Sequence, residues 1–311
     1  MKSYKVFLKF RFKGINLLLK VLILLCFSSS GNAQELEPRS LTNIPVKMNF
    51  VVAGYGYSYG NTLLDSSIPI EDLNSKLHGI VAAYARSINF FGMGGKVDVI
   101  IPVAFGDWNG YLEGNYATAS RSGMGDPRFR LSFNFFGSPA KKLEEFQYYH
   151  PHTIAGFSLQ VYTPLGQYFE DKLINLGANR WTFKPQIGIA RYKGKWIIES
   201  YFSVWLYTAN EAFSGTNKLK SQPLYVFKFH VIRSLPKNTW LTIDLGYGIG
   251  GKTILNDLLR DDRISTIRLG ATYAIPVAKR HTIKFTALSA IRFERGADYD
   301  AFAISYQYRW F

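Results

Sequence analysis

The chain ends at residues 302–311 with the sequence FAISYQYRWF, in which large apolar residues alternate with small or polar ones. The even positions are Phe302, Ile304, Tyr306, Tyr308 and Trp310. The odd positions are Ala303, Ser305, Gln307 and Arg309. Successive side chains of a β-strand point to opposite faces of a sheet, so this pattern predicts a strand with one apolar and one polar face. Such a division is typical of a barrel that meets lipid outside and water inside.

The other end of the chain has the pattern of an export signal. Five basic residues and no acidic ones precede an apolar run at 15–27, and small residues follow at 31–33. This order predicts a signal peptide over residues 1–33, cleaved before Gln34. A single membrane anchor and a lipoprotein site at Cys26 are the alternatives, but the run is short for a span and Leu24 and Leu25 are not small. Residues 34–47 are then a periplasmic N-terminal segment and 48–311 the barrel. Cys26 is the only cysteine, so the mature chain has none.

The charge composition of the chain indicates which kinds of partner to expect. The chain has 37 basic and 22 acidic residues, and six of the basic ones lie in the leader, which leaves a net charge of about +9. These charges are scattered singly, so we expect outer-membrane lipid, lipopolysaccharide phosphates and small solutes as partners, and no nucleic acid. After the leader no apolar run of about eighteen residues occurs, which excludes a helical membrane protein but not a barrel.

Period-two segments separated by turn residues recur along the mature chain. They lie near 48–59, 75–90, 95–105, 127–136, 153–164, 180–192, 195–207, 223–233, 239–250, 264–275, 281–293 and 300–310. The segment at 77–89 is ambiguous, because neither set of alternate positions is clearly polar. The sequence therefore predicts an all-β fold, a transmembrane antiparallel β-barrel of about 12 strands. A soluble β-sandwich or lipocalin-like barrel would put the apolar positions inside and leave many charges along one face, which makes it the weaker interpretation.

The connections predict the orientation. Short joins alternate with longer polar stretches at 60–74, 106–126, 165–179, 208–222, 251–263 and 294–299. Outer-membrane barrels have short periplasmic turns and longer extracellular loops, so both termini should be periplasmic. The connection at 137–152 is long yet falls on the periplasmic side, and its role is left open, as is that of residues 34–47. Trp196, Trp240 and Trp310 should form an interfacial belt at the periplasmic strand ends.

Three stretches carry a resemblance to a known family. They are GMGDPRF at 123–129, TPLGQY at 163–168 with LGANRW at 176–181, and YKGKW at 192–196. Together they resemble the outer-membrane family named after the meta-pathway of phenol degradation, over nearly all of the mature chain. The resemblance implies a barrel transporter often associated with aromatic compounds, and it supplies no catalytic residues. Read physically, the glycines and the Asp126-Pro127 pair are turn-forming residues, so a scaffold role is favoured over ligand contact.

No feature of the sequence requires an enzyme, a cofactor or a metal. The serines and His230 with inward parity have no spacing that links them as a catalytic set, and His150 and His152 lack the further ligands of a metal site. The ionisable residues with inward parity are instead candidates to line a pore and set its selectivity. These pore-lining candidates are Lys96, Asp98, Arg128, Arg130, Lys184, Glu199, Lys228, His230, Asp244 and Arg268.

Two functions remain open. The first is an outer-membrane channel or facilitator for small solutes, with hydrophobic or aromatic compounds as candidates and a weak anion preference from the basic excess. The second is a non-conducting structural or ligand-binding barrel that works through its extracellular loops. The segment at 106–126, the longest predicted external loop, carries Trp108, Tyr111 and Tyr116 and is expected to fold over the mouth. The sequence identifies neither the solute, nor whether the lumen is open, nor the oligomeric state.

Overall fold

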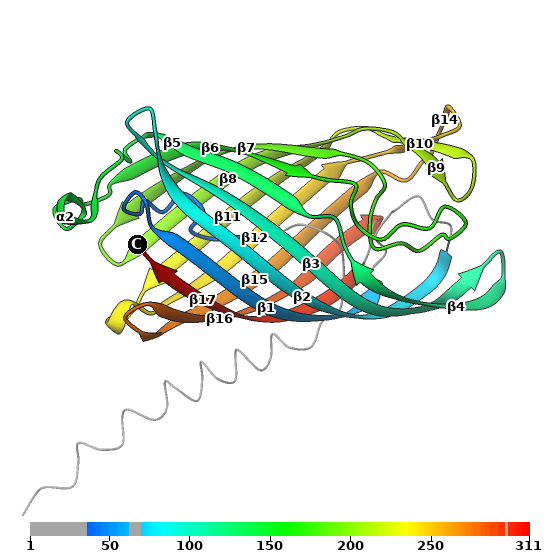
Figure 1. Ribbon diagram of the computed structural model, residues 1–311. Helices are drawn as coiled ribbons and strands as arrows, with labels where there is room; N and C mark the ends of the chain where they lie inside the picture. The colour runs from blue at the N-terminus through cyan, green and yellow to red at the C-terminus, as the bar shows by residue number, and fades with distance from the viewer. Residues whose placement is uncertain (1–35, 62–69, 296–297) are drawn as a thin grey trace, which may run out of the picture.

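The computed structural model describes residues 36–61, 70–295 and 298–311, in which twelve strands close into an antiparallel barrel (Figure 1). The barrel strands are β1 (Asn49–Asn61), β2 (Ile70–Phe90), β3 (Met93–Leu112), β5 (Arg128–Phe136), β6 (Thr153–Tyr162), β7 (Thr182–Lys193), β8 (Trp196–Tyr207), β11 (Leu224–Ser234), β12 (Trp240–Gly250), β15 (Ile264–Ala278), β16 (His281–Arg295) and β17 (Asp298–Trp310). The last strand pairs with the first, from Asn49 opposite Trp310 to Asn61 opposite Asp298. This closure pairs the backbone groups that an open sheet edge would expose to lipid.

The predicted fold and the strand number are confirmed. On β17 the side chains of Phe302, Ile304 and Tyr306 are exposed on the outside of the barrel, as the alternation indicates. Exposed aromatic and aliphatic side chains such as Phe129 and Phe227 continue this apolar surface on other strands. A soluble protein would not expose so many, whereas a hydrocarbon environment requires them. The predicted signal peptide lies outside the described residues.

The two ends of the barrel differ in their connections. The C-terminus, the short turns and the four-residue helix α2 (Leu143–Phe146) lie at one end, the periplasmic end by the rule used above (Figure 1). The opposite, extracellular end carries longer excursions. Within the described residues, no helix is both long enough and apolar enough to cross a membrane.

The prediction of a long external loop at 106–126 is wrong. Strand β3 continues to Leu112, and β4 (Asn115–Met124) returns beside it with Leu112 opposite Asn115. The hairpin turns at Glu113 and Gly114, which both have positive φ, as a tight two-residue turn requires. The sequence concealed this strand because a hairpin that rises above the membrane needs no apolar lipid-facing side.

Two other predicted loops also contain short strands. Strands β9 (Asn210–Phe213) and β10 (Asn217–Ser221) join β13 (Thr253–Leu255) and β14 (Leu258–Leu259) in a separate four-stranded sheet at the extracellular end. The predicted connection at 294–299 is mostly strand, because β16 runs to Arg295 and β17 starts at Asp298.

Candidate functional site

The interior of the barrel is partly filled by the chain's own N-terminal part. Residues 36–48, called the inner segment here, belong to the stretch predicted as a periplasmic extension, but the structure places them in the lumen. Leu36 lies against β15, where a Cβ added at Gly270 would be 2.7 Å from its Cδ1. Leu41 is buried in an apolar inner cluster that contains Ile154, Ala190, Ile197, Tyr201, Ile232, Trp240 and Ala274. Because these residues come from β6 to β15, the inner segment leans against that half of the wall.

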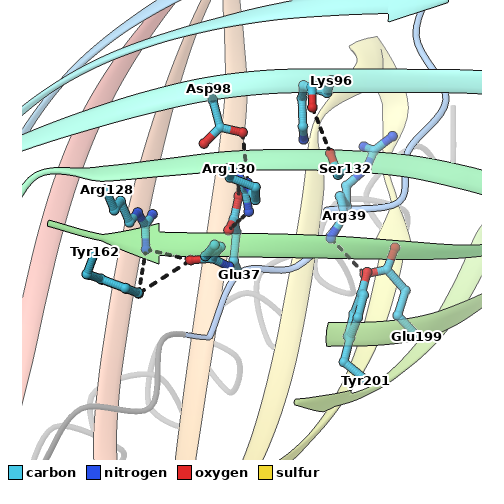
Figure 2. Close-up of polar contacts among 11 residues, drawn as sticks. Glu37, Arg39, Lys96, Asp98, Arg128, Arg130, Ser132, Tyr162, Glu199 and Tyr201 are labelled. Atoms are coloured by element: carbon cyan, nitrogen blue, oxygen red, sulfur yellow. Dashed lines mark hydrogen bonds and ion pairs between the residues drawn. The ribbon is translucent and has the colours of Figure 1, made fainter. Parts of the chain in front are cut away.

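An ion-pair chain ties the inner segment to β5 and β3 (Figure 2). The Arg130 guanidinium donates to both carboxylate oxygens of Glu37, at 2.5 and 2.9 Å, and through Nε to Asp98 at 2.8 Å. Burial alone would raise the pKa of Glu37, but Coulombic attraction to Arg130 and Lys96 holds that pKa well below its usual value. Glu37 is therefore anionic at neutral pH, and the bidentate geometry makes its pairing with Arg130 directional.

A second anchor lies across the lumen on β8. The backbone N–H of Arg39 donates to Glu199 Oε2 at 2.7 Å, and the Tyr201 hydroxyl donates to the same oxygen at 2.9 Å (Figure 2). The Arg39 guanidinium stacks over the Trp240 ring at 5.3 Å. Trp240 therefore faces the lumen, and its predicted place in an outer aromatic belt is wrong. Its position on β12 has the parity of the buried residues, while its neighbour Leu241 has the outward parity.

The long periplasmic connection holds the lower part of the inner segment. The Val46 N–H donates to the carbonyl of Lys141 at 2.9 Å, and the Asn43 side chain donates to the carbonyl of Pro139 at 3.2 Å. The Asn134 side chain on β5 donates to the carbonyl of Leu41 at 3.0 Å. Residues 137–152 thus contact and hold the described part of residues 34–47. These are the two stretches whose roles the sequence leaves open.

A cavity of about 1050 Å³ remains beside the inner segment. Its strand residues come mainly from β15, β16, β17, β1, β2 and β3, with Arg128 and Arg130 of β5 and Trp240 of β12 at its borders. Its basic lining residues are Arg39, Lys96, Arg128, Arg130, Lys279, Lys284 and Arg309, and its acidic ones are Glu37 and Asp98. Both carboxylates bind Arg130, so the remaining cations determine the sign of the field in the cavity.

One wall of this cavity is apolar, although it faces the lumen. Phe50 and Val52 of β1, Val81 and Ala83 of β2, and Ile100 of β3 all line it. This explains the ambiguous parity of residues 77–89, since β2 carries apolar residues on both faces. The apolar residues on both faces of β2 are the sequence signal for the cavity. Alternation alone does not identify which of these two faces points into the lumen.

Above this wall, small residues occupy one row across four strands. Ala303 lies opposite Gly56, Gly56 opposite Gly79, and Gly79 opposite Ala104, from β17 through β1 and β2 to β3. They share the inward parity of the cavity lining. A Cβ built at Gly79 would meet no atom within 4 Å. We call this the small-residue row, and it leaves open space in the middle of the lumen.

The structure divides the ten pore-lining candidates into two groups. Lys96, Asp98, Arg128 and Arg130 line the cavity. The others are buried away from it: Lys184, Glu199, Lys228, His230, Asp244 and Arg268. Several pack on rings, with Lys184 over Trp205, Lys228 over Tyr201 and Arg268 over Tyr299. The role of this second group in a pore stays a prediction.

His230 belongs to a buried polar chain, and its Nδ1 lies 2.6 Å from Asp244 Oδ1. Thr242 donates to the other oxygen of that carboxylate at 2.8 Å. Across the described ranges, no group of three or more His, Cys, Asp or Glu side chains could hold a metal ion.

An apolar outer cluster lies at the extracellular end of the barrel. Its buried members are Leu73, Trp108, Ile174, Phe213 and Leu219, from β2, β3, the 163–181 connection, β9 and β10. Around the wall, β3 and β8 are four strand spacings apart, roughly 20 Å. The 163–181 connection bridges this distance, because it joins β6 to β7 between them and contributes Ile174 to the cluster. Trp108 is buried in the cluster, whereas Tyr111 and Tyr116 are exposed; that the β3–β4 hairpin folds over the mouth stays a prediction.

The family-like motifs converge at the same end. The Asp126 carboxylate accepts the backbone N–H groups of Gly166 at 2.9 Å and Ala178 at 2.8 Å. Burial raises the pKa of Asp126, while these two hydrogen bonds lower it, and burial prevails. A Cβ at Gly177 would lie 2.8 Å from the Gly166 backbone, so only glycine permits this approach. The motifs thus act as a scaffold that fastens the 163–181 connection to the β4–β5 turn.

The fold and this interior define an outer-membrane β-barrel with an internal segment. A family model described as "Putative MetA-pathway of phenol degradation" matches residues 72–307, and the chain belongs to this family. No curated protein matches the sequence significantly.

Three solved structures are similar to the chain to different extents. An outer membrane channel from Pseudomonas putida F1 aligns with a TM-score of 0.74 at 19% identity, over 89% of this chain and 100% of that one. The β domain of the Bordetella autotransporter BrkA aligns with a TM-score of 0.49 at 12% identity, over 84% and 99%. The monoaromatic hydrocarbon channel CymD aligns with a TM-score of 0.41 at 7% identity, over 86% and 89%. At these identities the first of these similarities establishes the fold.

Proposed function

We propose that the protein is an outer-membrane channel for small solutes and that the inner segment is its internal gate. The observation that carries this proposal is the cavity beside the inner segment, continued by the small-residue row. A purely structural barrel would be expected to fill its lumen with packed side chains. The solved outer membrane channel with the same fold supports the proposal.

The contacts of the inner segment suit a gate. No backbone ladder joins residues 36–44 to a barrel strand. These residues are held by separate contacts, among them the Glu37 ion pair, the Arg39 hydrogen bond and the packing of Leu41. Each of these contacts can break separately. Removal of a barrel strand, in contrast, would break the backbone hydrogen bonds that close the barrel. Release of the inner segment would therefore widen the lumen and leave the wall intact.

The apolar wall indicates which solutes fit. Phe50, Val52 and Val81 suit hydrophobic or aromatic groups, and the cations across the cavity suit polar or anionic ones. The proposal also includes export through a cleaved signal peptide, recognition of the C-terminal strand by the insertion machinery, and contact with lipopolysaccharide.

Liposome swelling tests the proposal with one deletion and two point variants. Deletion of residues 34–44 should raise solute entry, because it removes the upper part of the inner segment. Adding Gly79→Phe to the deletion should lower entry again, since the ring projects into open space. The matched control is Ile80→Phe in the same background, because Ile80 is 49% exposed on the lipid side of the same strand.

The outer cluster favours the alternative function, a barrel that does not conduct and works through its extracellular surface. It ties several extracellular excursions together by buried apolar contacts around Trp108, as a working extracellular surface would require. If the deletion variant inserts correctly and admits no solute, the channel proposal fails and this alternative replaces it.

A further inference from the structure

Two lysines face the cavity without a countercharge of their own. Lys96 of β3 and Lys284 of β16 both line it, and neither forms an ion pair with another described residue. The only lining carboxylates, Glu37 and Asp98, bind Arg130. Two unpaired ammonium groups in a confined space attract an anion.

The surroundings of Lys284 leave room for more than an inorganic ion. Lys284 lies opposite Ser305 of β17, Ser305 opposite Gly54 of β1, and Gly54 opposite Val81 of β2. The backbones of Lys284 and Val81 are thus three strand spacings apart, roughly 14 Å, with only a serine and a glycine between them. A lysine side chain spans about half of that distance, so space remains between the ammonium group and the apolar wall.

The apolar wall supplies the second half of the recognition. Val81, Val52 and Ile100 face the cavity from adjacent strands, on the side opposite the inner segment. An inorganic anion gains nothing from such a surface, whereas an apolar group gains by leaving water there. The wall and the two ammonium groups together match a solute that is charged at one end and apolar at the other.

We propose that this cavity binds a small organic anion, a carboxylate on an apolar body, with the carboxylate at Lys96 and Lys284 and the apolar body against β1, β2 and β3. This inference deepens the proposed function, on which it rests for the route by which the solute reaches the cavity. The site is accessible from the periplasmic end, because its lining includes Leu235 and Asn238 of a periplasmic turn.

Isothermal titration of the mature protein in a non-ionic detergent tests the site with three probes. Benzoate carries both features, benzyl alcohol lacks the charge, and formate lacks the apolar body. Benzoate should bind at least tenfold more tightly than either of the others. Equal binding of benzyl alcohol would overturn the role of the lysines, and equal binding of formate would overturn the role of the apolar wall.

Variants locate the binding. Lys284→Gln and Lys96→Gln should each weaken benzoate binding at least tenfold, and Lys284→Arg should retain it. Lys252→Gln is the control, since Lys252 lies outside the cavity and pairs with Asp261. Heat-modifiable gel mobility verifies that each variant folds. Benzoate affinity unchanged in Lys284→Gln would overturn the proposal.

Conductance of the same samples separates this inference from the channel proposal. A protein that conducts but binds none of the probes lacks the proposed site and leaves the channel standing. A protein that binds benzoate as predicted but admits no solute, even after deletion of residues 34–44, retains the site and loses the channel.

Discussion

The ion pair between Glu37 and Arg130 should control how often the inner segment leaves the lumen. Glu37→Gln removes the charge and one of two hydrogen bonds at 2.5 and 2.9 Å, and Arg130 keeps its bond to Asp98. A hydrogen bond to a charged group contributes about 1.5–3 kcal/mol. The Glu37 side chain is 33% exposed, so solvent screening reduces this contribution. We therefore expect a loss of about 1–2 kcal/mol, which raises the released population roughly 5- to 30-fold.

The mature chain offers a clean assay for this release, because its only cysteine lies in the predicted leader. A cysteine placed at Ser40 on the inner segment should react slowly with a maleimide in the parent protein. In the Glu37→Gln background its labelling rate should rise by the factor above, and single-channel open probability should rise with it. Glu211→Gln is the matched control, since Glu211 forms an ion pair with Lys218 on the extracellular β9–β10 hairpin. If labelling and open probability in Glu37→Gln stay within twofold of the parent, the ion pair does not hold the inner segment.

Four further outcomes are expected. Because the folded pKa of Glu37 is depressed, its contribution to holding the inner segment is fully present above its usual pKa and is lost as the pH falls through the lower folded value. Single-channel open probability should therefore rise only in strong acid, and Glu37→Gln should lack this rise. Phe227→Arg on the lipid face should lower the free energy of unfolding in urea by about 2–4 kcal/mol, and Ala303→Arg on the lumen face should lower it clearly less. Equal losses in the two variants would show that the lipid and lumen faces are wrongly assigned. Asp126→Ala should free two backbone N–H groups and speed proteolysis within 163–181, with unchanged cleavage as the contrary result. Trp108→Ala should destabilise the outer cluster by about 3–5 kcal/mol and increase hydrogen exchange in β9 and β10, which a merely local role would leave unchanged.

The barrel itself could be predicted because its determinants are local. Alternation, turn residues and strand length each depend on a few consecutive positions, and a lipid-facing strand has to be apolar on one side along its whole length. All twelve predicted strands occur, and the terminal one pairs as β17 with β1. Strand β4 was missed because its position above the membrane removes the requirement for an apolar face. Trp240 lies near a strand end, where belt residues are common, but its parity on β12 is that of the buried residues.

The candidate site was predictable only in part. Lys96, Asp98, Arg128 and Arg130 have inward parity, and parity depends on the sequence alone. The contact of Arg130 with Glu37 joins residues 93 positions apart, which no periodicity encodes. The inner segment has no strand pattern, and its only signals were apolar residues such as Leu36 and Leu41 in an otherwise polar stretch.

The amino-acid sequence is sufficient to predict a barrel, its number of strands and the lipid-facing side of most strands, because these properties follow from side-chain alternation and the solvent on each face. Strand β2 is the exception, since it is apolar on both faces. Only tertiary packing places residues 36–48 in the lumen, against one side of the wall. That outcome depends on the summed shape of the interior: the large residues of the inner cluster attract Leu41 to one wall, while Gly54, Gly56 and Gly79 leave space along the other. Shape complementarity between distant segments exists only after the barrel closes.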